Sequence, residues 1–130
     1  MEKRDLKDRT KQFTLRVLNL IDALPHTTKG RLISDQPGRA GSSVGANYRA
    51  ACRARSKSEF MAKLGTVIEE ADEAAFWLEV IIEGRVLERS LVAPLWQEAD
   101  EIVAIKSAPR TARDMTRSRK TAESNLKTRR

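Results

Sequence analysis

The sequence predicts an all-α protein built as an up-and-down bundle of four helices. Its 130 residues suit one domain of ordinary size. A content of 40% hydrophobic and only 5% aromatic residues is typical of helical proteins rather than of β-sandwiches. Four segments repeat apolar residues every three or four positions, and no segment alternates as a strand does. Four such helices joined by short loops can cover one another's apolar faces.

The first helix is predicted over residues 6–24. Its apolar stripe repeats at intervals of four and three residues and consists of Leu6, Thr10, Phe13, Val17, Leu20 and Leu24. Pro25 continues a helix poorly and Gly30 gives the following turn its freedom. The helix is therefore expected to end near Leu24.

The second helix is predicted over residues 31–54. Its apolar side consists of Leu32, Ile33, Ala40, Val44, Tyr48, Ala51 and Cys52. Pro37 and Gly38 interrupt it, which predicts either a kink or a helix that begins anew near Pro37. The small residues between Ala40 and Ala51 leave little side chain between backbones, so this helix should approach its neighbours closely. Cys52 is expected to be a small buried residue.

The third helix has the clearest start in the chain. Ser56 can accept a hydrogen bond from the backbone N–H of Glu59 while the Glu59 carboxylate reaches back, which is the reciprocal pairing of a capping box. A stripe then runs unbroken to Gly84 and consists of Phe60, Leu64, Val67, Ala71, Ala74, Leu78 and Ile81. Such a regular stripe favours antiparallel packing against other helices.

The fourth helix is predicted over residues 88–105, with Leu91, Leu95, Ala99, Ile102 and Ile105 on its apolar side. Pro94 is tolerated in a first turn, so the helix is expected to begin between Leu91 and Ala93. Helices three and four also carry apolar residues off their stripes, namely Ile68, Phe76, Trp77, Val80, Ile82, Val92, Trp96 and Val103. These residues form either a wide core face or a subunit interface, and we expect an oligomer.

Charge is segregated along the chain. Residues 29–63 carry eight bases and two acids, whereas residues 64–105 carry two bases and ten acids. Arg49 and Arg53 can form interhelical or intersubunit ion pairs with the acids at 69–73. If these acids do not pair with them, the two arginines can instead bind nucleic-acid phosphates. Both interpretations stay open. The candidate nucleic-acid residues of this region are Arg49, Arg53, Arg55 and Lys57.

The C-terminus is a basic tail. Residues 106–130 hold nine bases and two acids, a net +7 that equals the formal charge of the whole chain. We therefore expect a bundle domain over residues 1–108 and a disordered tail over residues 109–130. The tail either solubilises a structural or protein-interaction module, or binds RNA or DNA nonspecifically in a salt-sensitive way. Its candidate binding residues are Arg110, Arg113, Arg117, Arg119 and Lys120.

The chain lacks the residues that common catalytic and metal sites need. Cys52 is its single cysteine and His26 its single histidine, which excludes an internal disulfide and a Cys/His zinc site. A Glu-x-x-His motif for two metals is also missing. No apolar run approaches the ~18 residues of a membrane span, and the N-terminus is too charged for a signal peptide. We expect a cytoplasmic protein with no membrane contact, no cofactor and no enzymatic activity.

Three stretches resemble a known family. They are "LKDRTKQFTLRVLNLIDALP", "SSVGANYRAACRARSKSEFMAKLGTVIEEADEAAFWLE" and "RTAR", which together extend from Leu6 to Arg113. The chain resembles the four-helix-bundle proteins of intervening sequences in bacterial large-subunit ribosomal RNA, relatives of the accessory protein of diversity-generating retroelements. The resemblance implies a homopentameric ring, no catalysis, and contacts with nucleic acid and with a reverse transcriptase or another nucleic-acid enzyme. Pro37 and Gly38 replace two residues that are usually apolar in the family.

Overall fold

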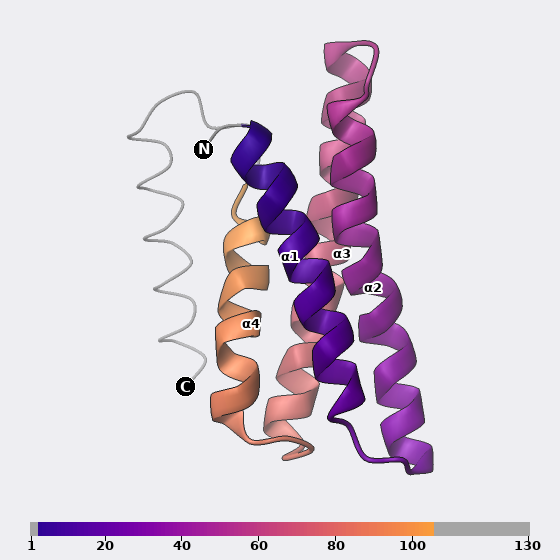
Figure 1. Ribbon diagram of the computed structural model, residues 1–130, viewed down its shortest axis with the longest axis vertical. Coiled ribbons are helices and arrows are strands. Elements are labelled where there is room, and N and C mark those ends of the chain that lie inside the picture. The colour runs from indigo at the N-terminus through magenta and orange to yellow at the C-terminus, as the bar shows by residue number, and fades with distance from the viewer. Residues whose placement is uncertain (1–2, 106–130) are drawn as a thin grey trace.

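The structure is a computed structural model that describes residues 3–105, and within that range every regular element is a helix. The helices are α1 (Lys3–Asp22), α2 (Thr28–Cys52), α3 (Lys57–Glu83) and α4 (Arg89–Val103). Successive helices run in opposite directions, and α4 returns to lie beside α1 (Figure 1). The predicted up-and-down four-helix bundle is therefore confirmed for this part of the chain. The tail expected over residues 109–130 lies outside the described residues.

The stripe predicted for the first helix forms the inner face of α1. Leu6, Phe13, Val17 and Leu24 are buried. Thr10 is also buried, and its hydroxyl donates to the backbone carbonyl of Leu6 at 2.7 Å. Because this local bond satisfies the hydroxyl, a polar residue can occupy a core position.

Helix α2 is a single helix, so the expectation of a new start near Pro37 is wrong. It begins at Thr28, before the predicted position, with the Thr27 hydroxyl accepting from the N–H of Gly30 at 3.0 Å. Pro37 lies inside the helix and is buried. A proline removes one helical hydrogen bond at the cost of about 3 kcal/mol. Burial of the proline ring returns part of that cost.

The glycines of α2 allow α1 to approach closely, as the small residues predicted. A Cβ added at Gly41 would lie 2.7 Å from a methyl carbon of Val17. The Thr14 hydroxyl donates to the carbonyl of Gly41 at 2.6 Å and accepts from the N–H of Gly45 at 3.1 Å. This side-chain bridge between two backbones requires the short distance that the glycines permit.

The sequence predicted the ends of α3 well and the start of α4 less well. The Ser56 hydroxyl caps α3, and Gly84 ends it. A Cβ on Gly84 would lie 2.8 Å from the carbonyl oxygen of Val80, and the left-handed residue of the turn is Arg85, with φ 54°. Helix α4 begins at Arg89, two residues before the earliest predicted position, so Pro94 lies beyond the first turn.

The apolar face of α4 is wide and rotated relative to the predicted stripe. Val92 and Trp96 are buried, which confirms the wide core face for these two residues. Leu91 was expected in the core and is 59% exposed. The indole N–H of Trp96 donates to the carboxylate of Glu79 on α3 at 3.1 Å. This bond ties the tryptophan to α3.

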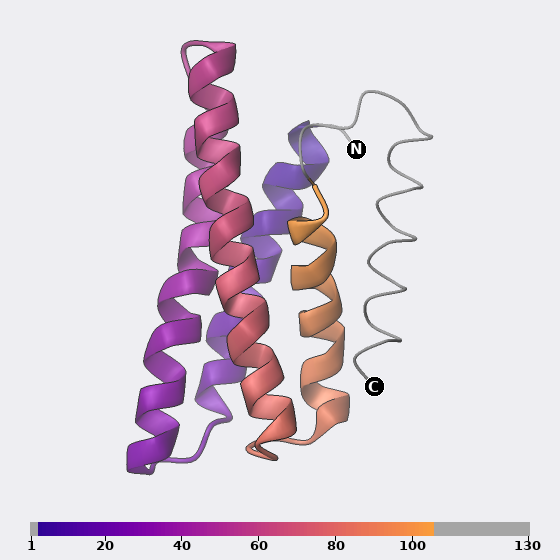
Figure 2. The same cartoon turned by 180° about the vertical axis from the view of Figure 1, so that it is seen from behind.

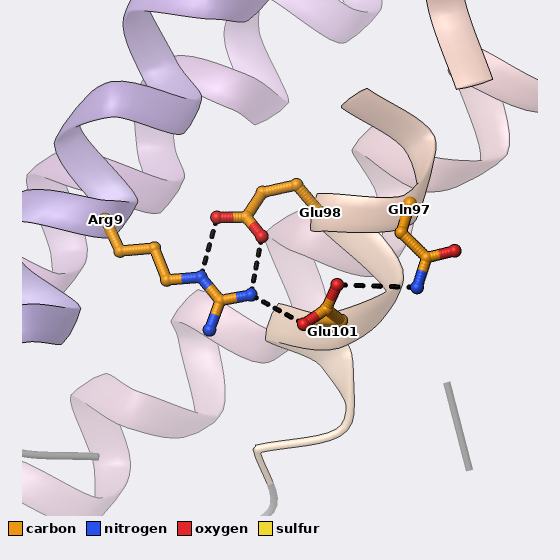
Figure 3. Close-up of polar contacts among 4 residues, drawn as sticks. All are labelled: Arg9, Gln97, Glu98 and Glu101. Atoms are coloured by element: carbon orange, nitrogen blue, oxygen red, sulfur yellow. Dashed lines mark hydrogen bonds and ion pairs between the residues drawn. The ribbon is translucent and has the colours of Figure 1, made fainter. Parts of the chain in front are cut away.

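An ion-pair network joins α1 to α4 (Figure 3). The Arg9 guanidinium binds Glu98 through two hydrogen bonds of 2.7 and 2.5 Å, and it binds Glu101 at 2.9 Å. The Gln97 amide donates to the second oxygen of Glu101 at 3.4 Å. The hydrogen bond to Glu98 is the main cause that raises the pKa of Arg9, against the lowering effect of burial. The network thus ties α1 to α4 through charge-assisted hydrogen bonds.

The hairpin formed by α2 and α3 projects beyond the rest of the bundle. These two helices have 25 and 27 residues, whereas α1 and α4 have 20 and 15. Figures 1 and 2 show the α2–α3 end extending past the neighbouring ends of α1 and α4. The turn at 53–56 and the adjoining helical turns are therefore accessible from several directions. The candidate residues Arg49, Arg53, Arg55 and Lys57 lie at this end.

Candidate nucleic-acid interface

The turn between α2 and α3 is held by two hydrogen bonds of opposite direction. The N–H of Glu59 donates to the Ser56 hydroxyl at 3.0 Å. The Glu59 carboxylate accepts from the N–H of Arg55 at 3.2 Å, one residue before the position that the capping box predicted. These bonds fix the backbone conformation of the turn that contains Arg55.

An open groove of about 450 Å³ lies at this end of the hairpin. Helix α2 contributes Ala46, Arg49, Ala50 and Arg53, the turn contributes Arg55, and α3 contributes Glu59 and Lys63. Residues three or four apart share one helix face, so the two arginines of α2 alternate with alanines along the groove. The short alanine side chains form the hollow, and the long basic side chains surround it.

The groove has a strong excess of positive charge. Four of its side chains are basic and one is acidic. The acid, Glu59, already accepts a hydrogen bond from the backbone of Arg55. Among residues 3–105, Arg49 and Arg53 are exposed and form no ion pair. Positive charges that no carboxylate neutralises are available to an anionic ligand.

The acids of α3 pair with Arg39 rather than with Arg49 or Arg53. Arg39 on α2 contacts Glu73 at 2.7 Å and Glu70 at 3.9 Å. Burial, and next the neighbouring Glu73, raise the pKa of Glu70, while Arg39 lowers it. The interhelical ion pairs expected for Arg49 and Arg53 are therefore absent from the described part of the chain, and Arg39 takes their place. Pairs between subunits stay a prediction.

The structure brings together three of the nine predicted site residues. Arg49, Arg53 and Arg55 line the groove, whereas Lys57 is exposed nearby and is not part of the lining. The five tail residues, Arg110, Arg113, Arg117, Arg119 and Lys120, lie outside the described residues. Sequence reasoning missed Lys63. The available signal was its position four residues after Glu59, because both residues face α2 once the turn is closed.

The groove can bind an anion by charge, and its lining provides no other chemistry. None of its residues is aromatic, histidine or cysteine. Bases therefore have no ring in the groove on which to stack, and the only recognisable group is the phosphate backbone. Within residues 3–105, acidic, histidine and cysteine side chains do not gather in threes to hold a metal ion. No helix in that range is long and apolar enough to span a membrane.

Comparisons with known proteins agree with the fold. The model of the 23S rRNA-intervening sequence protein family matches residues 2–108. The chain belongs to this family. A structure from the S23 ribosomal protein family of Bacteroides thetaiotaomicron, a crystal structure of a protein of unknown function, is 29% identical with a TM-score of 0.69. The match covers 98% of this chain and 99% of that one. None of the curated proteins compared with the chain matches it.

Membership of the 23S rRNA-intervening sequence family confirms that part of the resemblance, whereas the relation to retroelement accessory proteins stays a prediction. The family match ends at residue 108. The groove at 46–63 lies well inside the matched region, whereas the tail candidates begin after it.

Proposed function

We propose that this 23S rRNA-intervening sequence protein is a non-enzymatic protein that binds RNA or DNA without sequence preference. The groove at the end of the α2–α3 hairpin carries the proposal, because Arg49, Arg53, Arg55 and Lys63 surround one open hollow. Guanidinium and ammonium groups bind phosphate oxygens strongly when carboxylates do not compete. The projecting hairpin gives an extended polymer unobstructed access to the groove.

The contrast with the other arginines supports a binding role for the groove. Arg9 and Arg39 join helices of the bundle through carboxylates within 2.9 Å. Arg49 and Arg53 join nothing in the described chain, and the helix around them is held by Tyr48 and Ala51 in the core. Their charges are therefore unnecessary for the fold and available for a ligand.

The test is a salt series of binding to a labelled RNA and a labelled DNA duplex. The double variant Arg49→Gln/Arg53→Gln should weaken binding of both. Each phosphate contact adds about 0.7 to 0.9 to the slope of log K against log salt, so the slope should fall by about 1.4 to 1.8. The control variant Lys11→Gln/Arg16→Gln removes two exposed charges from α1 and should keep a steeper slope than Arg49→Gln/Arg53→Gln does. Equal slopes for the two double variants would overturn the role of the groove.

The proposal includes the tail as a second, basic arm. Truncation after Ala108 removes Arg110, Arg113, Arg117, Arg119 and Lys120 and should weaken binding further without changing the mass of the assembly. If the full chain binds neither nucleic acid at low salt, it is a structural or protein-interaction module. In that case the truncation should have no effect on nucleic acid either.

We also propose that the chain works as a homopentamer beside a reverse transcriptase or another nucleic-acid enzyme. Support comes from the resemblance to retroelement accessory proteins. Five grooves on one particle would strengthen weak contacts by raising the effective concentration of binding sites. Light scattering on the purified protein tests the assembly, and co-purification with an enzyme encoded nearby tests the partner. A monomeric mass would refute the ring.

A further inference from the structure

The groove at the end of the α2–α3 hairpin has two levels of different charge. The contact of Arg39 with Glu73 at 2.7 Å fixes the register of these antiparallel helices. Arg49 follows Arg39 by as many residues as Lys63 precedes Glu73. Because every helical residue adds the same rise, Arg49 and Lys63 lie at one level of the hairpin. This first level therefore contains a cation from each helix.

The second level is mixed in charge and lies one helical turn, about 6 Å, nearer the end of the hairpin. The same register places Arg53 on α2 opposite Glu59 on α3, beside Arg55 of the turn. One oxygen of the exposed Glu59 carboxylate accepts from the N–H of Arg55 at 3.2 Å. Within residues 3–105 its other oxygen accepts no hydrogen bond, and Glu59 forms no ion pair. The second level therefore offers a hydrogen-bond acceptor among cations.

The negative charge of Glu59 is not required by its place in the turn. A glutamine serves as well as a glutamate in a capping box. In a groove that binds phosphates, the carboxylate repels the ligand and loses part of its hydration when the ligand binds. A ligand offsets this cost if it brings a hydrogen-bond donor, because an ionised carboxylate only accepts. In a sugar–phosphate backbone the ribose 2′-hydroxyl is such a donor, and the backbone of DNA has none.

We propose that the groove prefers RNA to DNA because Glu59 accepts a hydrogen bond from a ribose 2′-hydroxyl while Arg49 and Lys63 hold a neighbouring phosphate. The inference rests on the proposed function, since it requires that the groove binds a nucleic-acid backbone. Sugar and phosphate are adjacent in one strand, so a single strand makes both contacts. One net hydrogen bond corresponds to a preference of about three- to tenfold. The preference concerns the sugar and leaves binding independent of sequence.

Three labelled single strands test the preference with the full chain at low salt. They are oligouridylates of one length that carry ribose, deoxyribose or 2′-O-methylribose. The base is the same in all three, and single strands avoid the difference in shape between RNA and DNA duplexes. The 2′-O-methyl group keeps the 2′-oxygen and removes its O–H donor.

Fluorescence anisotropy should give an affinity for the ribose strand about three to ten times that for the deoxyribose strand. The 2′-O-methyl strand should bind as weakly as the deoxyribose strand. Equal affinities for ribose and deoxyribose strands would overturn the preference. A 2′-O-methyl strand that binds as tightly as the ribose strand would also overturn it, because the hydroxyl would then not act as a donor.

The variant Glu59→Gln identifies the acceptor. Its amide oxygen can still accept from the N–H of Arg55, and circular dichroism checks that the helices are kept. The deoxyribose strand should bind more tightly, because the repelling charge is gone. The ratio of ribose to deoxyribose affinity should fall towards one, since a neutral hydrogen bond is about half as strong as a charge-assisted one. An unchanged ratio would refute the role of Glu59.

A matched control separates the groove from the general charge of α3. Glu69→Gln removes an exposed carboxylate of the same helix outside the groove lining and should keep the wild-type ratio. An equal fall of the ratio in both variants would overturn the assignment to Glu59. If the wild type binds all three strands equally and Arg49→Gln/Arg53→Gln weakens them, the preference fails and the proposed function holds. If the wild type binds none of the strands, the proposed function fails as well.

Discussion

Replacement of Gly41 by alanine measures how much of the stability depends on the close approach of α1 and α2. The added Cβ would lie 2.7 to 2.9 Å from three carbons of Val17, closer than carbon atoms pack. Val17 is buried and β-branched, so it has one favourable rotamer in a helix and cannot turn away. The backbones must separate, which also stretches the 2.6 Å bond from Thr14 to the Gly41 carbonyl.

The expected loss is the balance of two opposing effects. Overpacking costs about 1 to 3 kcal/mol, and a weakened hydrogen bond adds up to about 1 kcal/mol. The better helix propensity of alanine returns about 1 kcal/mol. The free energy of unfolding should therefore fall by about 2 kcal/mol, which is a fall in Tm of about 8 °C for a domain of this size.

Urea unfolding followed by circular dichroism measures this loss, and a double-mutant cycle identifies its cause. Val17→Ala removes the methyl groups that the new Cβ would strike and by itself costs about 2 kcal/mol. Val17→Ala/Gly41→Ala should cost less than the sum of the single variants by about 1 kcal/mol, because each change relieves the other. If the two losses simply add, or if Gly41→Ala stabilises the protein, the close contact is not what requires glycine.

Three further predictions concern polar groups and use thermal unfolding. Ser56→Ala removes the cap of α3 and should cost about 1 kcal/mol, whereas an equal loss from the exposed Ser58→Ala would contradict the capping role. Burial raises the pKa of Glu70, so the folded chain holds that proton to higher pH than the unfolded chain and loses stability as pH rises from the ordinary to the raised pKa. Glu70→Gln should therefore flatten the decline of Tm between acidic and neutral pH, and an unchanged slope would contradict this. Arg9→Met leaves the Glu98 and Glu101 carboxylates facing each other without their cation and should cost about 1 to 2 kcal/mol; a loss no larger than that of Arg16→Met would show that the network contributes nothing.

Features that depend on neighbouring residues in the chain could be predicted from the sequence. The stripes of α1 and α3 follow from spacing alone, because a helix places residues three and four apart on one face. The cap at Ser56 also involves atoms only three residues apart. For the same reason Arg49 and Arg53 could be placed together on α2. The sequence carries one signal for Lys63, its spacing from Glu59, but the register of α3 against α2 that brings Lys63 beside Arg49 and Arg53 is decided by the tertiary structure.

The sequence by itself therefore determined the fold class, the approximate extents of the helices and three of the four basic residues of the groove. Only the tertiary structure decided which residues of similar type have which partner. Pro37 reads as a break and lies inside a buried helix, and Gly41 and Gly65 read alike although one faces Val17 and the other faces open space. The physical reason is that helical periodicity is a local property of the chain. Burial and close approach depend on segments that are distant in sequence and meet only after the bundle has formed.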